Sequence, residues 1–276
     1  MIDYLVVGHL TADLQEDGSR RTGGTALFAA LTAHQLGARV AILTTAAPDL
    51  DVSMIPADVE LMLIPSPVST TFRNTYEHNA RTQYMYMRAP TLPLEELRRA
   101  PRARVTHLGP VAYEIPVYEP SDVHGGFVGL TVQGMLRHVA PDKQVTTDAT
   151  LLRRMSFGGI HAMALSEEDV NGDEASVVAA AERLPIVALT RAERGATIWF
   201  EGQRREVPAF RANVVDPTGA GDVFATAFFL ALAAGADPVA AARQACAAAS
   251  CVIEGPGVAT LPTSDEVAAR IARGPA

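Results

Sequence analysis

The 276-residue chain has little cysteine, a single lysine and no long apolar run. Its two cysteines, Cys246 and Cys251, lie five positions apart, which suits neither a disulfide framework nor a zinc site. The lysine is Lys143, outside any Gly-Lys-Ser/Thr sequence, which excludes a P-loop. The longest apolar run, residues 223–234, is shorter than the roughly 20 residues that span a bilayer. We therefore expect a protein of the reducing cytoplasm with no membrane partner.

Basic residues are outnumbered, with 23 Lys and Arg against 31 Asp and Glu, and the formal net charge is -8. Such a surface repels phosphate backbones, so we expect no nucleic-acid partner. The composition, 48% hydrophobic and 20% charged, is that of an ordinary globular domain with a sizeable core. Asp3 stands where an export signal would be basic, which favours the absence of such a signal.

The chain begins with a strand, helix and strand pattern. Residues 4–7 form an apolar run of strand length, residues 26–36 have apolar side chains at helical spacing, and residues 40–43 form a second run. This unit predicts an α/β fold with a doubly wound, mostly parallel sheet flanked by helices, in a single domain over residues 1–276. Further helices are predicted at residues 220–234, 237–253 and 263–272, with Asp237-Pro238 and the Thr263/Glu266 pair at two of their starts.

Residues 60–88 interrupt this alternation. Three β-rich stretches, at residues 61–64, 70–76 and 82–87, are separated by Pro65-Ser66-Pro67 and by a polar tetrapeptide. Such spacing is typical of hairpins. We predict a small antiparallel lid, built from segments at about 11–22 and 60–88.

The most informative segment is Asp216-Pro217-Thr218-Gly219-Ala220-Gly221-Asp222, which runs directly into the apolar residues 223–234. A loop of small residues that begins a buried helix presents backbone N–H groups and the positive end of the helix dipole to one point, which suits phosphate. A dinucleotide fingerprint is excluded because Phe224 stands where its third glycine belongs. Asp222 is then placed to act as a base; the alternative is a tight turn with an ordinary acid at the helix start.

These residues carry a family resemblance. The signature DPTGAGD before an apolar helix resembles that of the ribokinase-like (PfkB) carbohydrate kinases, and Gly23-Gly24 resembles their N-terminal double glycine. The resemblance follows the order of elements over nearly the whole chain. It implies ATP-dependent, Mg²⁺-assisted phosphorylation of a hydroxyl group, with Asp222 as the catalytic base and the backbone of Gly219, Ala220 and Gly221 as an anion hole.

The resemblance also implies a donor side. Residues 190–195 resemble a Thr-x-Gly-x-x-Gly nucleotide loop with Ala192 in place of the first glycine, and Ser166 to Asp169 stand where the family has Asn-x-x-Glu. Asp216 matches a monovalent-cation ligand of some members, so K⁺ is a further expected cofactor. The nucleotide-binding residues that this assignment predicts are Ser166, Asp169, Thr190, Gly195, Gly219, Gly221 and Ala248.

The acceptor side is assigned in the same way. A carboxylate such as Asp13 can accept hydrogen bonds from two neighbouring hydroxyls of a sugar or polyol. Residues 71–76, 81–83 and 132–137 are similar to those of an inositol-kinase subset, with Thr131 where an acidic residue often precedes the Gln-Gly pair. A myo-inositol-like polyol or a monosaccharide is the leading acceptor. The predicted substrate-binding residues are Asp13, Gly23, Gly24, Thr71, Arg73, Gln83, Gln133 and Asp222.

Two alternatives stay open. A nucleoside kinase would need an aromatic platform for the base, which Phe28, Phe72 or Tyr84 could supply. A non-catalytic ligand-binding protein on a kinase fold is suggested by Ala192 and the altered Asn-x-x-Glu segment. Lids in the family often pair between subunits, which implies a homodimer, with a monomer as the alternative because this lid is short.

Overall fold

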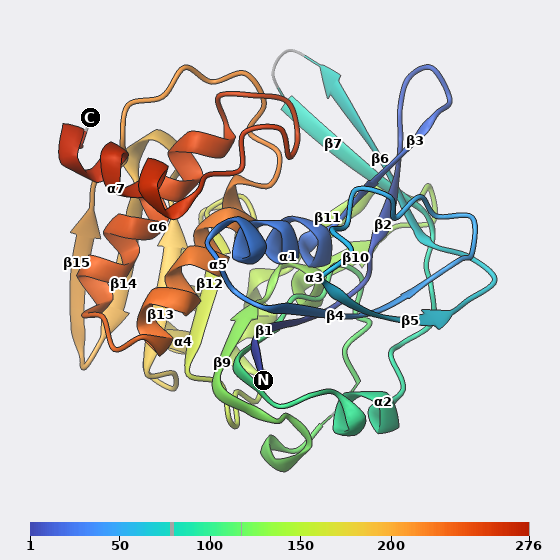
Figure 1. Cartoon of the computed structure of the whole chain (residues 1–276), viewed down its shortest axis with the longest axis horizontal. Helices are drawn as coiled ribbons and strands as arrows, with labels where there is room; N and C mark the ends of the chain where they lie inside the picture. Colours follow the sequence, from blue (N-terminus) through green and yellow to red (C-terminus); the bar gives the residue numbers. More distant parts are fainter. Residues whose placement is uncertain (78–79, 117, 276) are drawn as a thin grey trace.

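The computed structural model describes every residue except 78–79, 117 and 276. For residues 76–81, no side chain is described. Its main feature is a nine-stranded sheet in the order β15-β14-β13-β12-β9-β8-β1-β4-β5 (Figure 1). The strands from β13 to β5 run parallel, and β14 and β15 add an antiparallel edge. Their bounds are β1 Ile2–Val7, β4 Val40–Ala46, β5 Glu60–Pro65, β8 Ala103–Leu108, β9 Gly125–Thr131, β12 Ala162–Ser166, β13 Ile186–Thr190, β14 Ala196–Phe200 and β15 Gln203–Val207.

Helices cover both faces of this sheet, and the alternation of side chains along β1 shows why. Tyr4 and Val6 are buried in a core cluster with α1 (Thr25–Gln35), α5 (Ala220–Ala233) and α6 (Pro238–Val252). Leu5 and Val7 point to the other face, into a second cluster that includes residues of α2 (Leu94–Arg99) and α4 (Glu174–Ala181). A strand that is apolar on both faces needs cover on both. The predicted doubly wound α/β fold is confirmed.

The last two helices begin where the sequence predicts. The Asp237 carboxylate caps α6 by accepting from the N–H of Val239 at 2.9 Å, with Pro238 in the first turn. Thr263 and Glu266 form a reciprocal capping box at the start of α7 (Ser264–Arg273). Several short elements have no clear sequence signal: α3 Gln133–Leu136, the hairpin β10 Arg137–Val139 and β11 Val145–Thr147, and the 3₁₀ turns Pro120–Asp122, Ala149–Arg153 and Ala192–Arg194.

The lid is a separate four-stranded sheet in the order β3-β2-β6-β7, which projects from the body in Figure 1. Its strands are β2 Thr11–Leu14, β3 Arg20–Gly23, β6 Thr70–Glu77 and β7 Ala80–Met87. Two expectations are wrong in detail. Residues 60–65 form β5, which pairs in parallel with β4 at the edge of the main sheet, and the β2–β6 pair of the lid is parallel. Parallel pairs join segments that are distant in sequence, so turn residues carry no sign of them.

Candidate active site

The start of α5 depends on a glycine. Gly219 is the residue before the helix, with φ of 81°, and the N–H of Val223 donates to its carbonyl at 2.9 Å. A Cβ atom at position 219 would lie 2.1 Å from Cδ1 of Phe28, in α1. Both the left-handed backbone and this close approach exclude larger residues. The loop is therefore held tightly against α1.

Some backbone N–H groups of this first turn donate hydrogen bonds within the protein and others do not. Ala220 donates to the carbonyl of Pro217 at 3.2 Å. In the part of the chain that the structure describes, no hydrogen bond engages the backbone N–H groups of Gly219, Gly221 or Asp222. A Cβ atom at Gly221 would meet nothing within 4 Å. The donors open to an anion are thus those of Gly219, Gly221 and Asp222, whereas the predicted donor Ala220 is occupied.

Asp222 is a partly buried acid in this turn. Burial raises its pKa from 3.8 to about 6, although a hydrogen bond from the Thr25 hydroxyl and the charge of Arg137 lower it. The nearby charge of Asp169 raises it further. An acid with this pKa is ionised at neutral pH yet still has appreciable affinity for a proton, which is what general-base catalysis requires.

Arg137 is a residue of this site that the sequence analysis did not assign. It is buried, its Nη1 donates to the carbonyl of Val111 at 2.6 Å, and its guanidinium lies 5.0 Å from the ring centre of Phe72. The charge therefore faces Asp222 from a fixed position. In the sequence, Arg137 ends the 132–137 segment that resembles the inositol-kinase subset, but nothing in the sequence places it beside Asp222.

Asp169 forms hydrogen bonds both to a residue predicted for the acceptor and to one predicted for the nucleotide. Its carboxylate accepts hydrogen bonds from the backbone N–H and hydroxyl of Ser166, each at 2.8 Å, and from Nε2 of Gln133 at 3.0 Å. Gln133, predicted for the acceptor, and Ser166 and Asp169, predicted for the nucleotide, therefore meet at one point near Asp222. These three bonds hold the Asp169 carboxylate in a fixed orientation.

The lid presents one face to the body. The register pairs Asp13 with Phe72 on one side and with Arg21 on the other, so these side chains share a face. Phe72 fixes the direction of this face because it lies under Arg137. The Asp13 carboxylate accepts from the Thr11 hydroxyl at 3.1 Å, and a Cβ atom at Gly23 would lie 2.4 Å from its Oδ2. Gly23 is thus a glycine because the Asp13 carboxylate lies against it.

Other predicted acceptor residues divide between the two faces of the lid. Asn74 and Gln83 pair across β6 and β7, and Nε2 of Gln83 donates to Oδ1 of Asn74 at 3.0 Å, on the face of Asp13. Thr71 and Arg73 lie on the opposite face by alternation. The Thr71 hydroxyl is buried and donates to the carbonyl of Ser69 at 2.9 Å, while Arg73 is exposed. The structure does not bring these two residues to Asp222.

Gly24 completes the acceptor side. It precedes α1 with φ of 89°, and a Cβ atom there would lie 2.8 Å from the carbonyl oxygen of His9. The double glycine therefore lets α1 begin directly beside β2, which places Thr25 against Asp222.

The donor side carries a network of ion pairs. Arg191, which is buried, bonds to Glu167, to Glu174 at 2.7 Å and to the Thr197 hydroxyl at 2.6 Å, and Arg194 also bonds to Glu167. These partners lower the pKa of Glu167 (Arg194 first) and of Glu174 (Arg191 first).

The predicted nucleotide loop lies beside this network. Thr190 ends β13, and Gly195 has φ of 89° with the carbonyl oxygen of Val207 only 2.0 Å from a Cβ atom placed there. Ala192, in the place of the family glycine, has φ of 48° and so adopts the left-handed backbone that favours glycine. Ala248, in α6, is fully buried in the core cluster.

Asp216 connects the signature to the loop after α6. Its Oδ1 accepts from the N–H of Thr218 and its Oδ2 from the N–H of Gly257, each at 2.9 Å. Burial alone would raise its pKa, but these hydrogen bonds and the charge of Arg21 bring the pKa below the usual value. Arg21 reaches this loop from the lid, since a Cβ atom at Gly257 would lie 1.7 Å from its Nη2.

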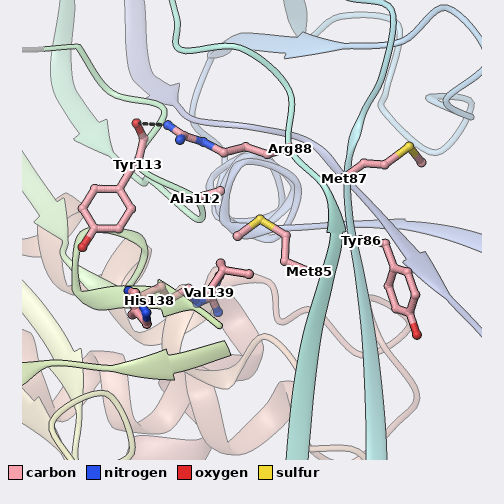
Figure 2. A pocket seen from close by; sticks show the side chains of 9 residues that line it. Met85, Tyr86, Met87, Arg88, Ala112, Tyr113, His138 and Val139 are labelled. Atoms are coloured by element: carbon pink, nitrogen blue, oxygen red, sulfur yellow. Dashed lines mark hydrogen bonds between the residues drawn. The ribbon is translucent and has the colours of Figure 1, made fainter. Parts of the chain in front are cut away.

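A surface cavity of about 470 Å³ adjoins the acceptor side, between β7 and the 112–113 and 137–139 segments (Figure 2). Arg137 forms part of its wall, so one guanidinium borders both the cavity and the region of Asp222. Figure 2 shows Met85 directed into this hollow and the bond from Arg88 to the carbonyl of Tyr113, at 2.9 Å.

Among the described residues, no three His, Cys, Asp or Glu side chains gather as they would around a metal ion. None of the helices in the described ranges has the length and apolar character to cross a membrane.

Comparison with known sequences places residues 161–265 in the family model "pfkB family carbohydrate kinase". A nucleoside kinase of Methanocaldococcus jannaschii is 36% identical over 92 residues, which are 33% of this chain and 30% of that protein. The bifunctional protein HldE of Mesorhizobium japonicum is 41% identical over 91 residues, 31% of this chain and 18% of that protein. The matches thus span less than a third of either relative.

Solved structures are similar over the whole chain. A pyrophosphate-dependent kinase in the ribokinase family, complexed with a pyrophosphate analog and myo-inositol, superposes with a TM-score of 0.76 at 21% identity over 96% of this chain and 99% of that one. A nucleoside kinase of Burkholderia thailandensis in complex with inosine gives a TM-score of 0.73 at 20% identity over 98% and 97%. At these identities the likeness establishes the fold.

Proposed function

We propose that this chain, a member of the PfkB family by its residues 161–265 and by its ribokinase fold, transfers a phosphoryl group to a hydroxyl of a small polyol or sugar. The observation that carries the proposal is the partly buried Asp222, whose carboxyl has a raised pKa, beside three backbone N–H groups that no described residue engages. A base and an anion hole at one point are what phosphoryl transfer needs from a protein.

The proposed reaction takes place at the start of α5. The acceptor hydroxyl gives its proton to the Asp222 carboxylate while its oxygen forms a bond to the terminal phosphorus of the donor. The bond from that phosphorus to the bridging oxygen breaks, and the leaving group departs with that oxygen, as ADP from ATP or as phosphate from pyrophosphate. The N–H groups of Gly219, Gly221 and Asp222 donate to the oxygens on which charge accumulates. Arg137 offsets the negative charge that Asp169 and Asp222 place together.

The proposed donor is ATP with Mg²⁺. The ion would be held mainly by the donor phosphates, since no three acidic, His or Cys side chains gather among the described residues. When bound, Mg²⁺ supplies charge neutralisation on the transferred phosphate. We retain K⁺ at Asp216 as part of the proposal. Because one similar structure is that of a pyrophosphate-dependent kinase, pyrophosphate is the donor to compare with ATP.

The acceptor is proposed to be a polyol or monosaccharide, not a nucleoside. Phe28 and Phe72, two candidates for a base platform, are buried under Gly219 and Arg137. Tyr84 pairs with Arg73 and so lies on the opposite face of the lid from Asp13. The polar face of Asp13, Asn74 and Gln83 offers acceptors and donors suited to hydroxyl groups.

The test is donor consumption with MgATP or magnesium pyrophosphate, with and without K⁺, against myo-inositol, ribose, fructose, other hexoses and nucleosides. Asp222→Asn is compared with Asp265→Asn, a matched change of an exposed acid in the first turn of α7. We expect turnover of a polyol or sugar that Asp222→Asn abolishes and Asp265→Asn preserves. Ligand-induced stabilisation with no turnover of any acceptor would favour the non-catalytic alternative, and turnover of nucleosides alone would favour the nucleoside kinase.

A further inference from the structure

Four polar side chains lie buried between the sheet and α5, and the proposed reaction uses none of them. They come from four elements: Tyr4 from β1, His107 from β8, Thr131 from β9 and Thr226 from α5. Tyr4, His107 and Thr226 have no exposed surface, and Thr131 retains 8%. Polar groups in such a place are tolerated only when each has a hydrogen-bond partner.

The four side chains form one continuous chain of hydrogen bonds. Thr131 Oγ1 lies 3.0 Å from His107 Nε2, and His107 Nδ1 lies 2.7 Å from Tyr4 Oη. Tyr4 Oη lies 3.1 Å from Thr226 Oγ1, which lies 2.8 Å from the backbone carbonyl oxygen of Asp222. This series of hydrogen bonds therefore ends at the backbone of Asp222, the residue whose carboxylate is the proposed base.

Counting protons fixes the direction of these bonds. The Asp222 carbonyl can only accept, so the Thr226 hydroxyl donates to it and must accept from Tyr4. The Tyr4 proton is then used, so His107 donates to Tyr4 from Nδ1 and accepts from Thr131 at Nε2. The reverse direction would leave two oxygens 3.1 Å apart with no proton between them. His107 is thus neutral, with its proton on Nδ1.

Packing around the chain holds it in place. The ring of Phe229, from α5, meets the His107 ring edge to face with 5.1 Å between centres. Gly129 pairs with His107, and a Cβ atom there would lie 2.4 Å from the Phe229 ring. This absence of a side chain lets α5 approach β9. Burial also lowers the pKa of His107 to about 3, which agrees with a neutral ring.

From this geometry we propose that Thr131, His107, Tyr4 and Thr226 are positioning residues that hold the first turn of α5, and with it the Asp222 carboxylate, at a fixed place over the strand ends. The inference rests on the proposed role of Asp222 as the base. Thr131 is two residues before Gln133, which bonds to Asp169. The series of hydrogen bonds thus links the end of β9, beside the proposed acceptor site, to the backbone of Asp222. A misplacement of about 1 Å in a reacting group costs about 100-fold in rate.

The structure offers a matched pair of variants. Thr226→Val removes a buried hydroxyl that bonds to the carbonyl four residues earlier, while keeping the shape of the side chain. Thr32→Val makes the same change in α1, where the fully buried Thr32 hydroxyl donates to the Phe28 carbonyl at 2.7 Å. Both changes remove one hydroxyl and its bond within a helix, and Thr226→Val also removes the acceptor of the Tyr4 hydroxyl. Only Thr226 is connected to Asp222.

We expect Thr226→Val to lower kcat by about tenfold or more with little change in the KM of either substrate, and Thr226→Ser to restore it. Thr32→Val should lower the melting temperature by less, because Thr226→Val also leaves the buried Tyr4 hydroxyl without its acceptor, and it should leave kcat within about twofold. Equal kcat values for the two valine variants would overturn the inference while leaving the proposed function intact.

Two NMR measurements decide the inference even if no acceptor is turned over. Nitrogen shifts of His107 should show the neutral Nδ1–H form between pH 5 and pH 8, and an Nε2–H form would contradict the chain. The carboxyl carbon of Asp222 should titrate at about 6 in the parent protein and in Thr32→Val. It should titrate closer to the ordinary Asp value in Thr226→Val, and an unchanged titration there would overturn the inference.

Discussion

The two sides of the proposed active site hold acidic residues in opposite environments. On the acceptor side, Asp222 is partly buried with one hydroxyl donor, and loss of water around its carboxylate raises its pKa to about 6. On the donor side, Glu167 and Glu174 are partly exposed, are paired with arginines and have lowered pKa values. The same kind of functional group is thus prepared to take a proton on one side and to remain charged on the other.

This comparison predicts which acid does the chemistry. A carboxylate that arginines hold in the charged form has little tendency to accept a proton, so the donor-side acids keep their arginines in position. The poorly compensated Asp222 is costly for folding, and that cost accompanies its basicity. Changes on the two sides should therefore have different consequences for rate and for stability.

The largest expected effect is that of Asp222→Asn on turnover. Without a base to take the acceptor proton, kcat should fall about 10³-fold or more. Steady-state kinetics on the acceptor identified by the panel measure it. Residual activity within tenfold of the parent protein would move the base elsewhere and end the contrast between the two sides.

The same variant should be more stable than the parent protein above pH 6. The folded-state pKa of Asp222 is raised from 3.8 to about 6, so the folded chain holds this proton more tightly than the unfolded chain. Stability therefore decreases as pH rises from about 4 to about 6, by up to about 3 kcal/mol. Asparagine removes this loss. Thermal unfolding at pH 4 and pH 8 checks the sign, and a pH-independent difference between the two proteins would contradict it.

Gly221→Ala and Gly219→Ala distinguish a glycine needed for phosphate binding from one needed for folding. A Cβ atom at Gly221 meets no protein atom, so Gly221→Ala should keep its melting temperature yet lose about 10- to 100-fold in kcat, because the methyl occupies the phosphate's place. Gly219→Ala, which meets Phe28 at 2.1 Å, should lose both activity and stability. Full activity in Gly221→Ala would show that no phosphate approaches there.

Arg191→Met tests the donor side. Losing this buried guanidinium leaves Glu167, Glu174 and Thr197 without a shared partner, so stability should fall by about 1 to 3 kcal/mol, with a severalfold rise in the donor KM. Arg204→Met is the matched control, because exposed Arg204 pairs with Glu174 and Glu206 and should contribute about 0.5 kcal/mol or less. Equal denaturation midpoints for the two variants would contradict the prediction that buried Arg191 stabilises the protein more than exposed Arg204.

The smallest effect is expected from Ala192→Gly. Ala192 already has the left-handed backbone, with φ of 48°, which costs a residue with a side chain about 1 kcal/mol. Glycine should therefore stabilise the protein by less than that amount, because it also makes the unfolded chain more flexible. Chemical denaturation measures the difference, and a loss of stability above about 1 kcal/mol would show that the alanine methyl packs usefully.

How far the sequence predicts this molecule depends on whether a feature is local. The segment from Asp216 to Asp222 is contiguous, so its glycines, its helix start and the acid in its first turn are all visible in the letters. The family resemblance and the doubly wound fold that it implied are confirmed. The capping box at Thr263 is another local feature that the structure contains.

Features that depend on pairing between distant segments were missed. The parallel partner of residues 60–65 is β4, which no turn residue indicates, so that segment was wrongly placed in the lid. The face on which Thr71 and Arg73 lie follows from the register of β2 with β6, which the sequence does not contain. Arg137 is brought to Asp222 by tertiary packing on Phe72 and Val111.

The pH dependence of kcat tests the central claim most directly. With Asp222 as the base, kcat of the parent protein should rise with pH through about 6 and then reach a plateau, as the carboxyl loses its proton. The residual rate of Asp222→Asn should show no such rise. A flat profile for the parent protein, or the same rise in Asp222→Asn, would contradict the assignment of Asp222 as the base.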